Sequence, residues 1–261
     1  MNRLLTLLLK TNRLGLQVGA FVILNSYFLP WLKHIPCLAL NCHACPLAVF
    51  ACPIGGLQNF AIIRQFPFYT LGILGTVAAL VGRLSCGWFC PFGLLQDLLY
   101  RVKLPKLNLS NNLGWFRYAI LFVLVGLIPL LTLEPWFCKL CPLGALEAGI
   151  PLAIIDGNVR AQIGWFFALK LVLLLLFIIW MVITKRPFCR FICPLGAIYG
   201  IFNRFSALQL RVDQAQCSRC NRCQQACPTD VRIYDKPNST QCIRCLDCVE
   251  ICPTSAISYL T

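Results

Sequence analysis

The residues with the clearest chemical potential are the cysteines, because the chain has 18 of them in 261 residues and all but two fall into closely spaced groups. Near the C-terminus the spacing C-x2-C-x2-C-x3-C-P occurs twice. This is the ligand signature of bacterial ferredoxins with two 4Fe–4S clusters, in which the fourth cysteine of each run crosses to the other cluster. We therefore predict one cluster on Cys217, Cys220, Cys223 and Cys252, and a second on Cys242, Cys245, Cys248 and Cys227.

Zinc is the main alternative for four cysteines, but zinc sites usually combine two CxxC pairs and not a triplet with one distant cysteine. Around the clusters we expect two short hairpins and two short helices, related by the pseudo-twofold symmetry of the repeated run. Charged residues between the cysteines are expected on the solvated surface, where the basic ones can dock an acidic partner. They are Asp213, Asp230, Asp247, Arg219, Arg222, Arg232 and Arg244.

Eight further cysteines form four pairs in the apolar part of the chain, each pair followed directly by proline. The pairs are Cys42-x2-Cys45-Pro46, Cys86-x3-Cys90-Pro91, Cys138-x2-Cys141-Pro142 and Cys189-x3-Cys193-Pro194. Their order is that of an internal repeat, with an apolar segment, a CxxCP pair, a second apolar segment and a CxxxCP pair in each half. Proline suits the first position of a helix, and the free N–H groups there favour an anionic ligand set.

The composition places these pairs in a membrane, because 59% of the residues are hydrophobic, 12% are charged and the mean hydropathy is +0.74. Such values lie outside the range of soluble domains. Four segments are long enough to cross about 30 Å of hydrocarbon: residues 14–32, 67–84, 115–133 and 163–183. Their basic residues are Arg83, Arg117 and Lys170. Arg117 and Lys170 are expected to snorkel toward the interface.

Lysine and arginine predict the orientation, because short cytoplasmic connections are enriched in both. The first and third connections carry only Lys33 with Arg64, and Lys139 with Arg160, whereas the N-terminal stretch, the second connection and the tail carry most of the others. We therefore expect a multi-pass protein of the cytoplasmic (inner) membrane, with an uncleaved first helix and with both termini and the cluster-binding tail in the cytoplasm. Disulfide bonds between the cysteines of the tail are not expected, because the cytoplasm keeps thiols reduced.

The formal net charge of +14 requires no nucleic-acid partner. The cationic excess faces anionic lipid, and it also offsets clusters that carry about −2 each when four thiolates bind a 2+ core.

With four crossings, the paired cysteines separate by side of the membrane. Cys42, Cys45, Cys138 and Cys141 are expected on the outer side, and Cys86, Cys90, Cys189 and Cys193 on the inner side near the tail. Each side gathers two thiols from each half, enough for one cluster or metal on a pseudo-axis along the membrane normal. We predict that these two sets bind two further iron–sulfur clusters, with zinc or copper as the alternative. Inert packed cysteines or a thiol–disulfide pair on the outer face remain open as well.

Several polar residues near the outer set have no assigned role. Cys37 and Cys52 are unmatched and are treated as bystanders, although Cys52-Pro53-Ile54-Gly55 resembles the other CP-x-G pieces and could replace a ligand. His34 and His43 are expected as interfacial anchors, with tuning of a cluster as a second role for His43. The acidic residues Glu134, Glu147 and Asp156 are expected in wet loops, with a proton path as the alternative.

The predicted fold is an α-helical membrane protein with four transmembrane helices in two parallel repeats, at about 14–100 and 115–200 within a membrane domain of residues 1–205. Short re-entrant or interfacial helices are expected where they line a site. Residues 206–261 are predicted to form an α+β ferredoxin-like domain that holds two clusters.

Residues 86–93 (C-G-W-F-C-P-F-G), residues 189–196, the Cys42-His43-Ala44-Cys45-Pro46 piece and the two C-terminal runs together resemble the NapH/NosR-type membrane iron–sulfur proteins. The resemblance covers essentially the whole chain. It implies a four-helix quinol dehydrogenase subunit with a cytoplasmic two-cluster domain, working between the quinone pool and a redox partner. The short, NapH-like form is expected, without the large periplasmic flavin-binding domain of the NosR type.

The expected function is that of an electron-transfer subunit of an oxidoreductase complex, which relays electrons across the bilayer between a quinone pool or outer partner and the cytoplasmic clusters. Its partners would be membrane lipid, other redox subunits and a quinone. The alternative is a membrane copper reductase or maturation factor for a respiratory metalloenzyme, and a third possibility is a passive anchor for a working ferredoxin tail. The sequence indicates no catalytic residue, no quinone site and no direction of electron flow.

Overall fold

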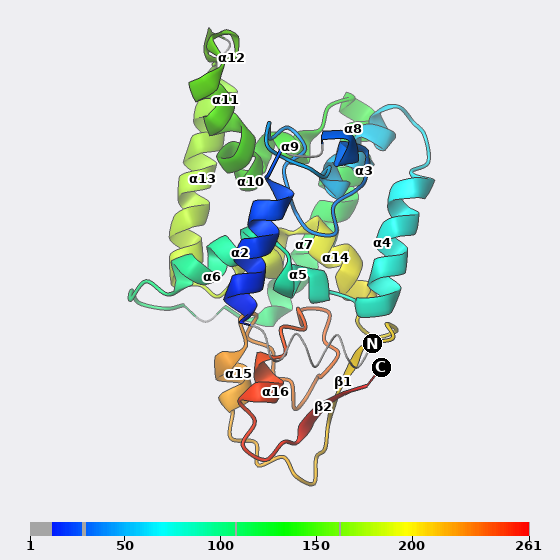
Figure 1. Ribbon diagram of the computed structural model, residues 1–261, viewed down its shortest axis with the longest axis vertical. Coiled ribbons are helices and arrows are strands. Elements are labelled where there is room, and N and C mark those ends of the chain that lie inside the picture. Colours follow the sequence, from blue (N-terminus) through cyan, green and yellow to red (C-terminus); the bar gives the residue numbers. More distant parts are fainter. Residues whose placement is uncertain (1–11, 28–29, 108, 162, 261) are drawn as a thin grey trace.

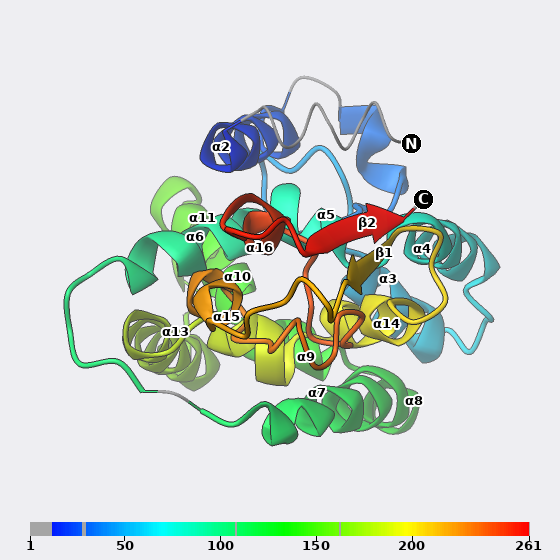
Figure 2. The same ribbon diagram turned by 90° about the horizontal axis from the view of Figure 1, so that it is seen from below.

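The computed structural model describes residues 12–27, 30–107, 109–161 and 163–260. Two parts are stacked along the long axis of the molecule, with a helical part above and a smaller cysteine-rich tail below (Figure 1). Seen from the tail side, the upright helices surround the tail, which lies beneath the centre of the helical part (Figure 2).

Four upright helical segments form the frame of the upper part. They are α2 (Arg13–Leu24), α4 (Phe68–Val81), the continuous segment Asn111–Thr132, and α13 (Trp165–Ile183). The third segment comprises η2 (Asn111–Trp115), α7 (Phe116–Ala119), the π-helical η3 (Ile120–Leu127) and α8 (Ile128–Thr132).

The four segments alternate in direction, because each has one end at the tail. Arg13 at the start of α2 pairs with Asp247 of the tail, and the carbonyl of Val81 at the end of α4 accepts a hydrogen bond from Arg244. Arg117, near the start of the third segment, donates to the carbonyl of Thr240. Lys185, just after α13, donates to the carbonyl of Gln225.

Two of the four predicted spans are shorter than the sequence indicates. Asn111–Thr132 and Trp165–Ile183 are long and apolar enough to cross a membrane, whereas α2 has 12 residues and α4 has 14. At 1.5 Å per residue these two helices measure roughly 18 Å and 21 Å. The N–H of Asn25 closes the last turn of α2 onto Phe21 and Val22, and Gly82 (φ +57°) ends α4 in a left-handed conformation that favours glycine.

Short helices fill both ends of the frame. The end away from the tail contains η1 (Pro30–His34), α3 (Pro53–Ile62), α9 (Trp136–Leu140), α10 (Pro142–Gly144), η4 (Ala145–Gly149), α11 (Ile150–Ile155) and α12 (Gly157–Ala161). The end beside the tail contains α5 (Leu84–Trp88), α6 (Pro91–Tyr100), η5 (Phe188–Ile192) and α14 (Pro194–Phe202).

The tail consists of β1 (Gln209–Val212), α15 (Arg222–Ala226), α16 (Asp247–Glu250) and β2 (Ile257–Leu260). Its first and last strands pair antiparallel, with Leu210 opposite Tyr259. The sequence predicts two hairpins, but this is the one sheet in the described part of the chain. Residues between Cys227 and Cys242 form turns instead, and Pro228 and Pro237 there lack the N–H that a strand ladder needs.

The tail and the upper part share a hydrophobic core. Leu84 and Trp88 of α5 pack with Leu210, Ile233 and Leu246 of the tail. The tail is therefore docked on the helical part through buried apolar surface.

Several arginines that the sequence places on the surface or at the lipid interface are buried at this junction. Arg117 is 0% exposed and Arg244 is 1% exposed. The prediction that Arg117 snorkels and that Arg244 is solvated is therefore wrong. Arg244 instead holds α4 and α14 together, with donations to the carbonyls of Val81 (3.0 Å) and Asn203 (2.8 Å).

Candidate metal centres

The inner set of four thiols lies together at the end of the helical part that faces the tail. Cys86 is in α5, Cys189 is in η5, and Cys90 and Cys193 directly precede α6 and α14. All four are buried. Burial raises the pKa of Cys90 and Cys193, and the neighbouring thiolates of Cys189 and Cys86 raise it further, which shows that the two halves of the repeat meet here.

Two buried arginines connect the halves reciprocally. Arg83, three residues before Cys86, donates to the carbonyl of Cys189 at 3.0 Å. Arg186, three residues before Cys189, donates to the carbonyl of Cys86 at 3.1 Å. The pattern R-x2-C-x3-C-P thus occurs in both halves, and each arginine holds the cysteine segment of the other half.

The charge of Arg83 indicates which kind of group the inner thiols can bind, because this arginine is 0% exposed. Its partners are the carbonyls of Thr240 and Cys189, its Nε is unpartnered, and within the described ranges it pairs with no carboxylate. A buried cation without a counter-ion is costly. A cluster with four thiolates carries about −2, so an anionic cluster on the inner thiols fits the charge of this site.

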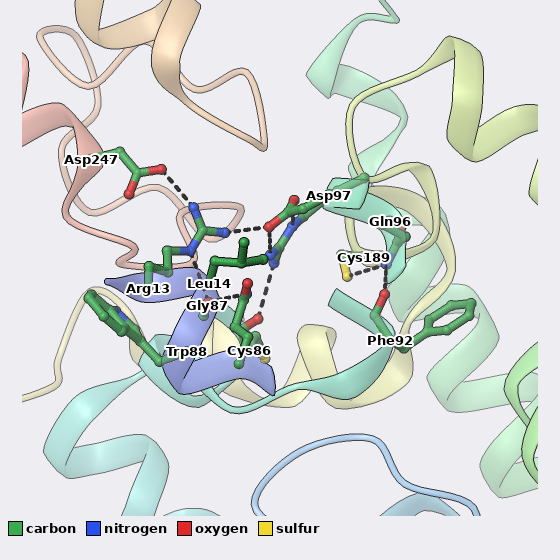
Figure 3. Close-up of polar contacts among 12 residues, drawn as sticks. Arg13, Leu14, Cys86, Gly87, Trp88, Phe92, Gln96, Asp97, Cys189 and Asp247 are labelled. Atoms are coloured by element: carbon green, nitrogen blue, oxygen red, sulfur yellow. Dashed lines mark hydrogen bonds and ion pairs between the residues drawn. The ribbon is translucent and has the colours of Figure 1, made fainter. Parts of the chain in front are cut away.

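An ion-pair network runs from the inner set to the tail (Figure 3). Arg186 Nε donates to Asp97 Oδ1 at 2.6 Å, and Asp97 also pairs with Arg13 at 2.6 Å. Arg13 also pairs at 2.7 Å with Asp247, which lies between Cys245 and Cys248 in the sequence of the tail. Asp247, expected as free surface, therefore ties the tail to α2 and α6.

The outer set lies at the opposite end of the helical part, and the structure brings only some of the predicted residues together. Cys42, Cys138 and Cys141 are close: burial raises the pKa of Cys138 to about 11 and of Cys141 to about 12, and nearby Cys42 adds to both shifts. The Sγ of Cys45 instead lies 3.9 Å from Oδ1 of Asn25, at the end of α2.

Three polar side chains surround the outer thiols. Glu147 accepts the N–H of Cys42 at 2.8 Å, and Gln58 donates to Sγ of Cys138 at 3.2 Å. Lys170 and Cys42 both lie next to Gly144. A Cβ atom added to Gly144 would lie 3.5 Å from Nζ of Lys170 and 3.7 Å from Sγ of Cys42. Lys170 therefore points from α13 to the outer centre, and the prediction that it snorkels is wrong.

The other polar residues of the outer end behave as ordinary surface groups. Glu134 forms an exposed ion pair with Lys139 at 2.6 Å, and Asp156 caps the next turn by accepting the N–H of Asn158. His34 is exposed.

The tail collects its eight cysteines in the two predicted sets. Cys217, Cys220, Cys223 and Cys252 line one small cavity. The other four thiols are buried, and the nearby Cys227 thiolate adds to the effect of burial on the pKa of Cys242, which rises to about 11. Both runs share a backbone conformation, because the residues on either side of the second cysteine have positive φ. Around Cys220 these are Arg219 (51°) and Asn221 (59°), and around Cys245 they are Arg244 (51°) and Leu246 (67°).

The buried tail set directly adjoins the inner membrane set. A Cβ on Gly87, between Cys86 and Cys90, would stand 2.6 Å from the carbonyl oxygen of Ile243 and 3.6 Å from Cα of Cys245. The indole Nε1 of Trp88 donates to the carbonyl of Arg244 at 3.1 Å. The ligand loops of two neighbouring centres are therefore in contact.

A glutamine donates a hydrogen bond to a cysteine sulfur in both the outer and the inner set. Gln96 donates to Sγ of Cys189 at 3.1 Å, as Gln58 does to Sγ of Cys138. Within the described ranges, no three His, Cys, Asp or Glu side chains converge on a single-ion site.

Gln96→Leu is expected to lower the reduction potential of the inner cluster, because an N–H···S hydrogen bond stabilises the more negative, reduced state. A net hydrogen bond of about 1 kcal/mol corresponds to roughly 40 mV for one electron. A redox titration followed by electron paramagnetic resonance measures the shift. Gln58→Leu is the matched control and should move the outer cluster alone, whereas an unchanged potential in both variants would contradict the assignment.

Comparison with known families agrees with this cysteine arrangement. A family described as "4Fe-4S binding domain" matches residues 64–110, 113–150 and 165–212, which together make up more than half of the chain, and a "4Fe-4S dicluster domain" matches residues 209–253. Proteins named NapH and NosR are among the similar sequences. The chain belongs to the NapH/NosR-type iron–sulfur family.

The similarity to individual relatives is moderate. An uncharacterized protein of Methanocaldococcus jannaschii is 33% identical over 61% of this chain and 57% of its own length. Ferredoxin-type protein NapH of Haemophilus influenzae is 29% identical over 58% of this chain and 49% of its own length. Regulatory protein NosR of Stutzerimonas stutzeri is 30% identical over 54% of this chain and 19% of its own length. The chain thus spans about half the length of the NapH-type relative, and no solved structure matches it.

Membership of the NapH/NosR-type family supports iron–sulfur electron transfer as the chemistry of this chain. Sequence reasoning missed the residues that hold its centres in place, above all Arg83, Arg186, Gln58, Gln96 and Lys170. Two repeated spacings could have revealed four of them: R-x2-C-x3-C-P contains both arginines, and C-P-x-G-x-x-Q contains both glutamines.

Proposed function

We propose that this NapH/NosR-type chain is a four-centre electron relay, with two 4Fe–4S clusters in the helical part and two in the tail. Electrons would pass between the outer centre, the inner centre, the buried tail cluster and the exposed tail cluster. The observation that carries the proposal is the contact of Gly87 and Trp88 with Ile243 and Arg244, because it joins the inner ligand loop to a tail ligand loop.

Exposure indicates the end of the relay at which a soluble partner docks. Cys220 is exposed, whereas Cys242, Cys245 and Cys248 are buried. Arg219 and Arg222 flank Cys220 and are exposed. The cluster on Cys217, Cys220, Cys223 and Cys252 is therefore the proposed site for an acidic redox partner.

The proposed topology has four crossings, with both termini and the tail on the cytoplasmic side of the inner membrane. It is supported by the alternating directions of α2, α4, Asn111–Thr132 and α13, each of which has one end at the tail. Since α2 and α4 are short, adjoining segments would complete those two crossings.

A quinone is the proposed partner within the membrane. An apolar cavity of about 520 Å³ lies between α2 and residues 35–39 and reaches Phe89, which precedes Cys90. It offers space for an isoprenoid chain close to the inner thiols.

Metal analysis of anaerobically purified chain tests the number of centres. Four cubanes predict about sixteen irons and sixteen acid-labile sulfides per chain, because each contains four of both. About eight irons would leave only the tail clusters and would contradict a relay through the membrane. Copper at the outer thiols would favour the metal-reductase alternative.

A further inference from the structure

The outer centre contains a cysteine that the paired motifs do not include. We infer that Cys52, and not Cys45, is the fourth ligand of the outer centre, together with Cys42, Cys138 and Cys141. The inference rests on the proposed function, since it requires a cluster at that end of the helical part. Four features of the structure support it.

The first feature is the helix that follows the cysteine. A proline-initiated helix begins directly after one cysteine in each half at both centres, and these cysteines are Cys52, Cys90, Cys141 and Cys193. They share one backbone conformation, with φ from −59° to −81° and ψ from 112° to 122°. Cys45-Pro46 lies instead in a turn, in which the N–H of Cys45 bonds to the carbonyl of Cys42 at 3.1 Å.

The second feature is a glycine three residues after each of these cysteines. Its missing side chain makes room for a basic group from elsewhere in the fold: at Gly55, Gly93, Gly144 and Gly196 the nearest side-chain atoms belong to His43, Arg186, Lys170 and Arg83, respectively. The N–H of Gly196 donates to Sγ of Cys193 at 3.2 Å, which illustrates the N–H···S contact that this turn permits. Three residues after Cys45 stands Ala48, which is not a glycine.

The third feature is a polar side chain six residues after the cysteine. Gln58 follows Cys52 at this spacing and Gln96 follows Cys90. Both amide groups make the same two donations, to the carbonyl four residues earlier and to the sulfur of a cysteine in the opposite half. At the outer centre Gln58 also accepts the N–H of Phe137 at 3.0 Å. The residue six after Cys45 is Ala51, which has no such group.

The fourth feature is proximity to the second half. Cys52 is buried in the same hydrophobic cluster as Phe137 and Leu143 of the second half, and Cys141 packs against that cluster. Cys45 is buried as well but is not part of this cluster. Cys52 therefore lies in the core that the two halves share at the outer centre.

Single serine variants of the full chain distinguish Cys52 from its matched control Cys45. Cys52→Ser is expected to lose about four of sixteen irons per chain together with the paramagnetic signal of one cluster, whereas Cys45→Ser retains the full count. Loss of four irons in Cys45→Ser with retention in Cys52→Ser would overturn the inference. If Cys52→Ser fails to accumulate, Cys45→Ser still decides, because a loss of four irons there contradicts the assignment and a full count supports it.

The variant Cys42→Ser/Cys138→Ser separates failure of this inference from failure of the proposed function. Both ligand assignments include Cys42 and Cys138, so an unchanged iron count would show that no outer cluster exists, which ends both proposals. A loss of about four irons there, with a full count in Cys52→Ser, overturns the ligand assignment alone.

Discussion

Replacing Cys86 and Cys189 together with serine is expected to abolish electron transfer between a quinol analogue and the tail clusters. These residues supply one thiol from each half to the inner centre, and that centre adjoins the buried tail cluster through Gly87 and Trp88. Changes outside a metal's ligand shell typically cost 10–100-fold in activity, so removal of two ligands should exceed about 100-fold. Stopped-flow absorbance of the tail clusters after addition of the reduced analogue measures the effect.

Val125→Thr is the control for this pair, since Val125 is also buried in the helical part but lies outside both ligand sets and outside the proposed quinone cavity. The double variant should lose about four irons and retain the signals of both tail clusters, which separates loss of the relay from loss of the fold. Undiminished transfer in the double variant would identify the helical part as a passive anchor.

Arg186→Gln is expected to destabilise the end of the helical part that faces the tail. The Arg186 side chain is 1% exposed and donates to Asp97 and to the carbonyl of Cys86. Breaking a buried ion pair typically costs about 3–5 kcal/mol, and the lower end applies here because Asp97 retains Arg13. A loss of about 3 kcal/mol corresponds to a fall of roughly 6–12 °C in melting temperature for a chain of this size.

Scanning fluorimetry of the detergent-solubilised protein, loaded with its clusters, provides the measurement. Arg160→Gln is the matched control, because Arg160 is exposed and bonds only to carbonyls of the neighbouring turn. Equal melting temperatures for the two variants would show that the buried contacts of Arg186 do not stabilise the fold.

The spacing of the cysteines was sufficient to predict which thiols the tail brings together. Each run is short, so its first three cysteines have few conformations in which they do not face one another. The placement of the outer and inner cysteine sets at opposite ends of the helical part was likewise predictable, since each apolar segment runs in the opposite direction to the one before it.

The assignment of Cys52, and not Cys45, as the fourth outer ligand could not be derived from the spacing of the cysteine pairs. Cys42 and Cys45 have the familiar CxxC spacing, whereas nine residues, including Pro46, separate Cys52 from Cys42. Only the folded chain shows that the helix begins at Pro53 and not at Pro46. The shared C-P-x-G-x-x-Q spacing was the available signal.

The burial of the arginines could not be predicted for a different reason. An arginine near the end of an apolar segment can snorkel or can be buried against carbonyl groups, and sequence does not distinguish the two. Arg83, Arg117, Arg186 and Arg190 are each at most 1% exposed. Helix length was overestimated for α2 because apolar residues continue beyond Asn25, where the helix has already ended.

The close approach of the Gly87 backbone to Ile243 has a kinetic consequence. A carrier that delivers electrons by swinging between two positions slows as the surrounding solution becomes more viscous. Here the Gly87 backbone approaches the Ile243 carbonyl so closely that a Cβ would not fit between them, so the transfer requires no hinge motion. Passage between the helical part and the tail should therefore proceed at the same speed in buffer and in concentrated glycerol.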